Sequence, residues 1–421
     1  MRMTIAEKIL ARAAGLSSVR PGDVVYPQPE LVILHDGYVE TAYKQLKDIG
    51  YEKLTHPERV MIITDHQVIY TTPKAIAQGR ANRRIAGEWQ VGHFFDGGRG
   101  GHGHIYPIEA ELVTPGMFLF AYDMHCTNFG AIGAFAQRAG PDITAVLATG
   151  TNWTIVPPTL RIDLSGSYAT GVHSRDFGFW LSGQLTSGKL GVEYDYRVIE
   201  FTGSALPSMS LAFRIALCNT LTEIGVANVM FPPPADAHRT YVNAVKSDID
   251  ATYEGTLHID LSEVVPQIAL PGGPDKAVCI EETVGRKIDH AYVGACGSGT
   301  YDDFVIVADL LKGHRVADHV RFFVVPGTVA TAQRLASEGI SNLFMEAGAI
   351  LLPPGCGPCA GGVGGPLGPG EVSISTAATN GAGRMGSLDA QCYLASPATV
   401  TASAIAGVIT DPREIASEVS I

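Results

Sequence analysis

The segment 353–362, PPGCGPCAGG, places Cys356 and Cys359 two residues apart among glycines and prolines. A C-x-x-C pair can be a redox disulfide, half of a zinc site, or two ligands of an iron–sulfur cluster. A redox disulfide would open a helix, because a helix N-terminus lowers the thiol pKa, but the glycine-rich sequence at 360–370 cannot propagate one. A zinc site needs four ligands, usually as two close pairs, and the chain has no second C-x-x-C.

A third cysteine, Cys296 in GACGSG, could complete a cluster site. The small residues around it would let the backbone approach an inorganic core closely and donate N–H groups to its sulfurs. The alternative is that Cys296 is a small buried apolar residue. The spacing favours a cluster held by three cysteines, and the alternative stays open.

Histidines and carboxylates recur in four stretches, TDHQV, GGHGHIYPIE, YDMHC and LTEIG. A single histidine is more often structural than catalytic. Three histidines with three carboxylates, however, are what proton transfer needs at a site that adds or removes water. The candidate acid/base residues are Asp65, His66, His104, Asp123, His125 and Glu223.

The elements that must position these residues follow an α/β pattern of short apolar runs between helical periods. Buried strands are predicted within 59–68, 116–131 and 289–299, ending at Asp65-His66, at Asp123 and His125, and at Cys296. Helices are predicted within 1–15, 170–185, 301–313 and 328–339, and further strands within 196–206 and 320–327. The stretch 210–233 is predicted to form a helix and then a strand closed by prolines. In open α/β sheets ligands gather beyond the carboxyl ends of the strands, where these residues are expected.

Length and composition exclude several classes of protein. The 421 residues are 46% hydrophobic and 17% charged, enough for two or three domains with a large core. The net charge of −12 argues against nucleic acid as a partner. No apolar run approaches 18 residues and the N-terminus is charged, so we expect no membrane span and no signal peptide. Seven scattered cysteines favour reduced thiols in the cytoplasm.

In order along the chain, these motifs resemble the aconitase family, in particular the large subunit of the isopropylmalate dehydratase and homoaconitase type. The resemblance covers essentially the whole chain. The family's D-H, G-x-x-H and D-S-H-T motifs match Asp65-His66, His104 and the DMHC of Asp123 and His125. Its CN…E-x-G-A helix and its cysteine motifs match Asn219 and Glu223, and Cys296, Cys356 and Cys359.

The resemblance implies a 4Fe–4S cluster with three irons held by Cys296, Cys356 and Cys359 and a fourth iron acting as a Lewis acid on the substrate. It also implies the pairs His66–Asp65, His104–Asp123 and His125–Glu223 as proton-transfer groups. Asn219 would lie in the cluster environment. Arg384 in GAGRMG matches an arginine that binds a substrate carboxylate.

The fold implied by the resemblance is α/β, with three α/β/α domains of the aconitase type around a central cluster site. The expected domains are 1–160 with the acid/base residues, 161–283, and 284–421 with the cluster cysteines; the proline- and glycine-rich 270–278 is a candidate boundary. The swivelling fourth domain of single-chain aconitases is expected to be absent. A separate small subunit is therefore the expected partner.

The sequence also departs from the family. Met124 and Cys126 replace serine and threonine in D-S-H-T, Ala378 and Thr379 replace an Asn-Arg pair, and GACGSG replaces G-S-C-T-N. Losing an arginine that pairs with a carboxylate costs roughly 2–5 kcal/mol of binding. Either the substrate lacks a carboxylate at that place or another cation supplies the pairing, which argues against the common substrates citrate and isopropylmalate. We expect a hydro-lyase of small 2-hydroxy (di)carboxylic acids. The alternatives are a different metal site with altered chemistry, or a non-catalytic binding or regulatory protein.

Overall fold

The computed structural model describes residues 2–234, 241–361 and 363–416. The chain forms two compact units, each assembled from three segments. Unit 1 comprises Met1–Ser165, Glu193–Leu211 and Gly225–Ile259. Unit 2 comprises Gly166–Val192, Ala212–Ile224 and Asp260–Ile421. The three-domain division expected from the sequence stays a prediction.

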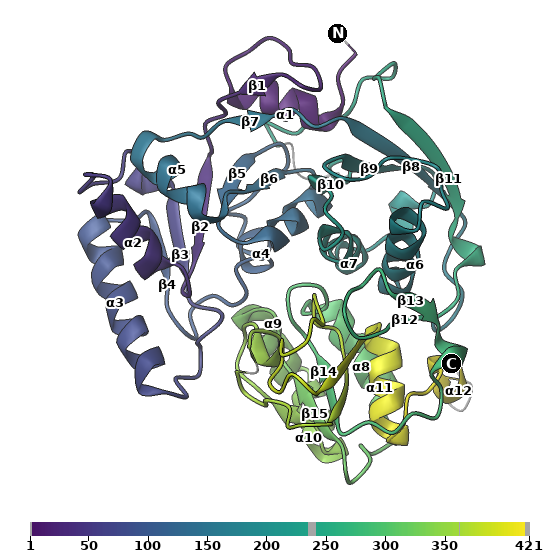
Figure 1. Cartoon of the computed structure of the whole chain (residues 1–421). Coiled ribbons are helices and arrows are strands. Elements are labelled where there is room, and N and C mark those ends of the chain that lie inside the picture. Colours follow the sequence, from purple (N-terminus) through teal and green to yellow (C-terminus); the bar gives the residue numbers. More distant parts are fainter. Residues whose placement is uncertain (1, 235–240, 362, 417–421) are drawn as a thin grey trace. The chain divides into compact units, whose positions relative to one another are not determined.

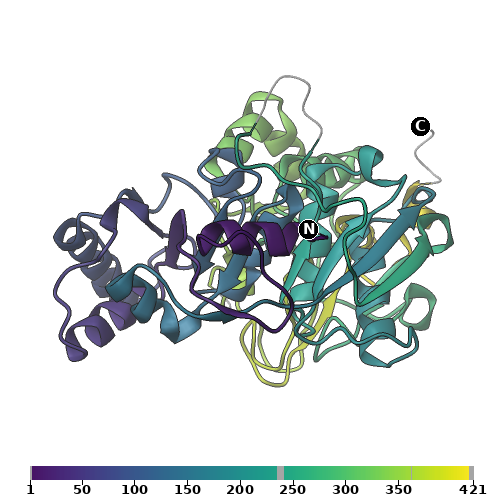
Figure 2. The ribbon, with the colours of Figure 1, turned by 90° about the horizontal axis from the view of Figure 1, so that it is seen from above.

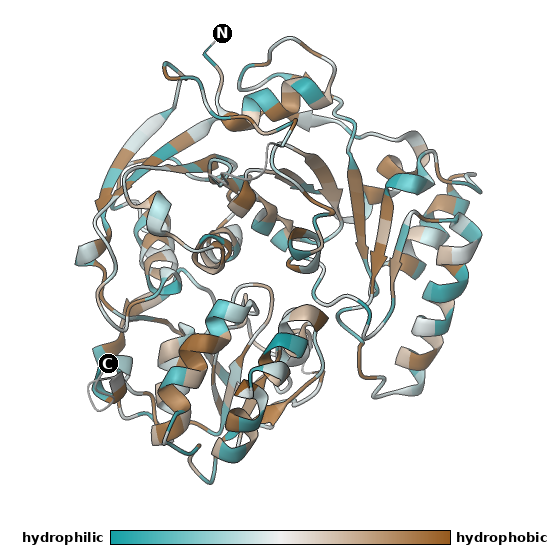
Figure 3. Cartoon of the chain, turned by 180° about the vertical axis from the view of Figure 1, so that it is seen from behind, coloured by the Kyte–Doolittle hydropathy of each residue, from teal (hydrophilic) through white to brown (hydrophobic). Residues whose placement is uncertain are grey.

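A parallel five-stranded sheet forms the first part of unit 1, in the order β4-β3-β2-β5-β6 (Figure 1). Its strands are β2 Leu31–His35, β3 Val60–Ile63, β4 His93–Phe95, β5 Phe118–Ala121 and β6 Phe135–Arg138. All residues of β2, β3 and β5 are buried, as expected for parallel strands covered on both faces. The strands are accordingly brown in Figure 3, whereas the helices beside them alternate between teal and brown.

Five helices surround this sheet, and each shows an apolar or small-residue face toward the core. They are α1 Ile5–Ala13, α2 Val39–Asp48, α3 Pro73–Trp89, α4 Tyr106–Glu109 and α5 Ile143–Thr149. The predicted N-terminal amphipathic helix is confirmed as α1, which starts at a capping box of Thr4 and Glu7. It packs on β5 and is the purple helix at the centre of Figure 2. Helices α2 and α3 lie side by side in Figure 1.

Unit 1 also contains a four-stranded sheet of order β10-β9-β8-β11 and a small two-stranded ribbon. The strands are β8 Thr159–Ser165, β9 Val198–Thr202, β10 Asn228–Met230 and β11 Gly255–Asp260, and in the ribbon β1 Val24–Val25 and β7 Thr154–Ile155. The strand predicted within 196–206 and the strand predicted to end the stretch 210–233 are confirmed as β9 and β10.

Unit 2 is built on a seven-stranded sheet of order β13-β12-β18-β17-β14-β15-β16. The strands are β12 Gln267–Ala269, β13 Ala277–Cys279, β14 His290–Val293, β15 Arg321–Val324, β16 Ile350–Leu351, β17 Val372–Ser375 and β18 Gln391–Leu394. The five strands from β18 to β16 are parallel, so their carboxyl ends share one edge. Segment 270–278 lies in the antiparallel hairpin of β12 and β13, so it is a turn within this sheet.

The helices of unit 2 are α6 Ser174–Thr186, α7 Leu211–Thr222, α8 Tyr301–Leu311, α9 Val329–Ser337, α10 Ile340–Ala347, α11 Pro397–Ala406 and α12 Pro412–Ala416. Helices α6, α7, α8 and α9 confirm the helices predicted there. Helix α11 packs on β14 and α8. Among the described residues, no helix is both long and apolar enough to cross a membrane.

Candidate functional site

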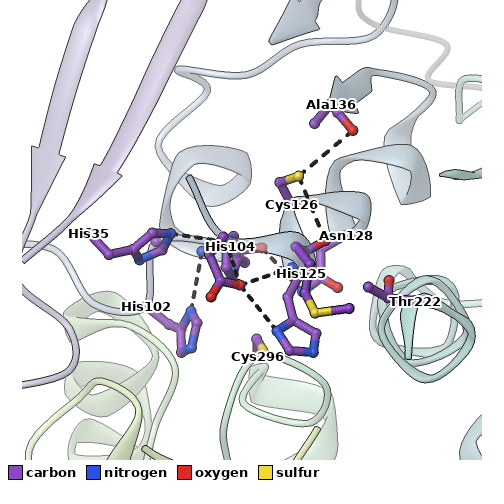
Figure 4. Close-up of polar contacts among 12 residues, drawn as sticks. His35, His102, His104, His125, Cys126, Asn128, Ala136, Thr222 and Cys296 are labelled. Carbon is purple, nitrogen blue, oxygen red and sulfur yellow. Dashed lines mark hydrogen bonds and ion pairs between the residues drawn. The ribbon is translucent and has the colours of Figure 1, made fainter. Parts of the chain in front are cut away.

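The histidines and carboxylates of unit 1 gather at the carboxyl ends of three neighbouring parallel strands. His35 is the last residue of β2, Asp65 and His66 follow β3, and Asp123 follows β5. Figure 4 shows His35, His102, His104 and His125 close together with their polar contacts. The predicted convergence of Asp65, His66, His104, Asp123 and His125 is therefore present within this unit.

Asp65 is the anionic centre of this cluster. Its Oδ1 accepts a hydrogen bond from His66 Nδ1 at 2.6 Å, and its Oδ2 accepts from His35 Nδ1 at 2.9 Å and from Gly103 N at 2.7 Å. Burial alone would raise the pKa of this carboxyl, but the charges and hydrogen bonds of His35 and His66 hold it well below its usual range. Asp65 is therefore ionised and fixes the orientation of both imidazoles.

His104 is held by a second histidine more closely than by the expected carboxylate. Its Nε2 lies 3.0 Å from His35 Nε2 and 3.8 Å from Asp123 Oδ1. Burial and the neighbouring His35 lower the pKa of His104 well below its usual value, so the ring is neutral. The Nε2 atoms of His35 and His104 share one hydrogen bond, in which one ring donates and the other accepts. The Nδ1 of His104 is buried and has no hydrogen-bond partner among the described residues.

Asp123 begins the 3₁₀ turn Met124–Ile132 and orients His125. Its Oδ1 accepts from the backbone N–H of His125 at 3.0 Å and from His125 Nδ1 at 3.2 Å. Burial raises the pKa of the Asp123 carboxyl, but the hydrogen bond and charge of His125 hold it well below its usual range. Glu223 follows α7 in unit 2, so the pairing of His125 with Glu223 stays a prediction.

Two histidines of this cluster were missed by the sequence analysis. His35 bridges Asp65 and His104, and buried His102 has its Nδ1 3.6 Å from Asp65 Oδ2 and accepts from the His104 N–H. Burial lowers the pKa of His102 to about 4, so this ring is neutral and structural. The signal for His35 is its position in LVILHD, a buried strand that ends in His-Asp much as β3 is followed by Asp-His.

The three candidate cysteine ligands lie in unit 2 at the carboxyl edge of its sheet. Cys296 follows β14, whereas Cys356 and Cys359 follow β16, and β15 separates these two parallel strands. None of the three is in a disulfide, and all are at most 5% exposed. Gly357 has φ 56° and a Cβ there would lie 2.7 Å from Val325, so only glycine allows this close approach of the loop to the sheet.

Tyr292 on β14 indicates that the three cysteines converge. Its hydroxyl donates to the backbone carbonyl of Cys356 at 2.9 Å. Burial, followed by the charges of Cys359, Cys356 and Cys296, raises its pKa well above the usual value. The charges of all three sulfurs therefore act on the Tyr292 hydroxyl.

Two nitrogen donors point at the sulfurs of this cluster. Asn219 Nδ2 on α7 donates to Cys296 Sγ at 3.0 Å. Arg384 follows β17, is half-buried, and its Nη2 lies 3.9 Å from Cys359 Sγ. The predicted placement of Asn219 near the cysteines is therefore present in the structure, whereas the substrate-binding role of Arg384 stays a prediction.

The donor set of unit 2 fits a cysteine-held iron–sulfur cluster. Three buried thiols at the ends of parallel strands, with N–H donors directed at two of the sulfurs, are the ligands and outer partners that such a cluster uses. Gly297, next to Cys296, allows Asn219 to approach this turn closely, because a Cβ there would lie 2.5 Å from Asn219 Oδ1. The chemistry of the thiols and of their N–H donors suits an inorganic core.

Comparisons with known proteins place this chain in a family. The sequence profile of the Aconitase family (aconitate hydratase) matches residues 7–407. The chain belongs to the aconitase family. It is 36% identical over 421 residues to "3-isopropylmalate dehydratase large subunit 1" of Methanopyrus kandleri, covering 98% of this chain and 99% of that protein. It is also 36% identical to "Probable methanogen homoaconitase large subunit" of Methanothermobacter thermautotrophicus, covering 98% of each.

The fold and reaction class of this aconitase-family chain follow from these matches. Its structure resembles that of Thermococcus kodakaraensis aconitase X in the holo-form, with a TM-score of 0.54, 84% of each chain covered and 13% identity. The α/β fold of the aconitase type expected from the sequence is therefore confirmed. The expected enzyme class, hydro-lyase, is confirmed as well.

Proposed function

We propose that this chain is the large subunit of an iron–sulfur-dependent hydro-lyase that acts on a small 2-hydroxy (di)carboxylic acid. The observation that carries the proposal is the set of three buried cysteines in unit 2 that form no disulfide, with nitrogen donors at Cys296 and Cys359. The relatives named as large subunits of a dehydratase and a homoaconitase support the reaction and the presence of a separate small subunit.

Cys296, Cys356 and Cys359 would hold a 4Fe–4S cluster, with Asn219 donating to Cys296. When bound, such a cluster supplies a Lewis-acidic iron for the substrate's hydroxyl and carboxylate. Arg384, half-buried beside Cys359, would bind a carboxylate of the substrate through its guanidinium. Ala378 and Thr379 offer no second cation at their positions, so the substrate is expected to lack an acidic group there.

The imidazoles of unit 1 would move the protons. His66 and His125 each face a carboxylate through Nδ1, so Nε2 is the atom that gives a proton to the departing hydroxyl, and the carboxylate stabilises the charged ring. Glu223 is proposed as a further partner of His125. His104 is neutral, so it is suited to accept a proton, as the reverse addition of water requires.

Metal analysis of protein prepared without air tests the cofactor. We expect about four iron and four acid-labile sulfide per chain, with the broad visible absorption of a cysteine-held cluster. A chain reconstituted under these conditions that holds neither iron nor sulfide would contradict the proposal.

The acid/base assignment is tested separately with His104→Ala. We expect turnover, measured with the small subunit present, to fall by roughly 10²–10⁴-fold, while iron and sulfide stay at the wild-type level. His258→Ala is the matched control, because this histidine of unit 1 has a side chain that is 77% exposed. Wild-type turnover of His104→Ala would remove His104 from the set.

A different metal site is the second candidate function, and one observation favours it. Ligand atoms of His35, Asp65 and His66 all lie within 4.8 Å of one another, as in a site for a single ion. In the structure these atoms already hydrogen-bond to one another. Metal bound without sulfide, and lost from Asp65→Asn but not from Cys356→Ser, would favour this candidate.

A further inference from the structure

Arg175 is the second residue of α6 and the largest fully buried side chain of the chain's described part. A buried cation loses its hydration, and the positive end of a helix dipole adds to this cost at an N-terminus. Among the described residues, no carboxylate lies within 4.0 Å of this guanidinium. The structure thus places a positive charge where the charge needs compensation.

Few contacts hold the guanidinium. Nη2 donates to the carbonyl of Ala377 at 2.8 Å, and the group lies 5.1 Å from the centre of the Phe179 ring. Nε and Nη1 are buried and have no hydrogen-bond partner in the described part of the chain. Two N–H groups therefore point into the protein without an acceptor, which costs about 1–3 kcal/mol for each in most proteins.

The two nearest buried carboxylates are engaged elsewhere. Asp176 accepts from the backbone N–H groups of His173 and Gln267, and Asp303 accepts from the N–H and hydroxyl of Thr300. Burial raises the pKa of each carboxyl to about 7, so near neutral pH neither is fully charged. They compensate the charge of Arg175 only in part.

The guanidinium lies against the turn that carries Cys296. A Cβ on Gly297 would collide with Arg175 Nη1 and with Asn219 Oδ1, so both side chains close on this residue. Burial lowers the pKa of Arg175 to about 10, and the largest opposing influence is the charge of Cys296, followed by Asp303, Asp176 and Cys359. The sulfur charges are thus positioned to stabilise this cation.

We propose that Arg175 is the counter-charge of the Cys296 and Cys359 thiolates and of the anionic cluster they hold, with Nη1 as an N–H donor to its sulfur. This inference rests on the proposed function, because it needs the cluster. Arg175 is a positioning residue that acts through the cluster and does not contact substrate. A nearby cation and N–H donors to sulfur raise the reduction potential of such clusters.

The test compares Arg175→Met, which removes the charge, with Arg175→Lys, which keeps it. The readout is the midpoint potential of the reconstituted cluster in a dye-mediated titration followed by electron paramagnetic resonance. At a fixed potential, Arg175→Met should lower the ratio of reduced to oxidised cluster at least tenfold. This corresponds to a midpoint potential that is lower by about 59 mV for a one-electron reduction. Lys should stay near the wild type, and so should Arg286→Met, which removes an exposed arginine of the same unit.

The melting temperature of the cluster-free chain distinguishes this role of Arg175 from a purely structural one. There the charge of Arg175 lacks its partner, so Arg175→Met should melt no lower than the wild type. Three results would each overturn the role of Arg175. They are an unchanged midpoint potential in Arg175→Met, equal shifts of the potential in Arg175→Met and Arg175→Lys, and unfolding of the cluster-free Arg175→Met chain. A wild-type chain without iron and sulfide would instead overturn the proposed function, and this is measured before any variant.

Discussion

The histidine–carboxylate cluster of unit 1 and the cysteine cluster of unit 2 differ in how their charges are balanced. In unit 1, Asp65 faces His35 and His66, and each carboxylate oxygen has a partner. In unit 2, the three cysteine side chains and the guanidinium of Arg175 are buried, and Nη1 and Nε of Arg175 lack acceptors in the described part of the chain. Both clusters lie at the carboxyl ends of parallel strands.

In unit 1 the carboxylate of Asp65 is satisfied as folded, whereas in unit 2 two buried N–H groups of Arg175 have no acceptor among the described residues. A carboxylate that is hydrogen-bonded in the folded state contributes stability without any ligand. Buried donors without an acceptor cost stability until a ligand satisfies them. Changes in unit 2 should therefore act mainly through what it binds, and changes in unit 1 through proton transfer and pH.

The largest effect is expected for Cys356→Ser. The variant should fold but lose iron, sulfide and turnover together, because the cluster loses one of three protein ligands. The matched control is Cys392→Ser, which changes a buried thiol of the same apolar cluster as Cys359 and should keep iron and sulfide. Wild-type iron and sulfide in Cys356→Ser would show that this cysteine is not a ligand.

An intermediate effect is expected at His35, where two substitutions separate its two contacts. Asn can replace the Nδ1 donor to Asp65, and Gln can replace the Nε2 contact with His104. If the function of His35 is to orient His104, His35→Asn should lower turnover by about 10–100-fold, because it loses the contact with His104. His35→Gln should lower turnover by less, and iron and sulfide should be unchanged in both variants. The pH profile of kcat/KM should shift in His35→Asn but not in His35→Gln. Identical profiles for the two variants would contradict a role of His35 in linking Asp65 to His104.

The smallest effect concerns the pH dependence of stability, which should run oppositely in the two units. The folded-state pKa values of Asp65 and Asp123 are depressed. Their contribution to the stability of the fold is therefore full above about pH 3.8 and is lost as the pH falls through the folded-state pKa values. The folded-state pKa of Asp303 is raised from 3.8 to about 7, so the folded chain binds more protons than the unfolded chain between these values. Rising pH across this window should therefore destabilise the chain through Asp303.

Asp303→Asn removes this term and keeps an oxygen that can accept from Thr300. The free energy of unfolding of the cluster-free chain is measured with urea between pH 4 and 7. As pH rises, it should fall less steeply in Asp303→Asn than in the wild type, with a difference in slope of about 1.4 kcal/mol per pH unit. Above pH 7 the slopes of the two chains should agree. The exposed Asp250→Asn serves as the control, and identical slopes for all three chains would contradict a protonated Asp303.

Much of the site was predictable because its residues follow strands that the apolar runs reveal. Asp65 and His66 follow β3, and Asp123 follows β5, as the pattern indicated. His35 was missed although it ends an apolar run and precedes Asp36, because it belongs to none of the motifs from which the candidate residues were chosen. The segment 270–278 has the composition of a linker but forms part of a hairpin, since glycine and proline favour both.

The sequence by itself determined several of the strands and helices, the cysteine spacing and the residue types that follow those strands, because these depend on local periodicity and on motifs of a few residues. Only the tertiary structure decided that His35 joins Asp65, 30 residues away, to His104, 69 residues away. It also decided that Arg175 faces the turn after Cys296. Such contacts depend on which strands become neighbours and on how helices pack against their ends, and no local pattern in the chain encodes that arrangement.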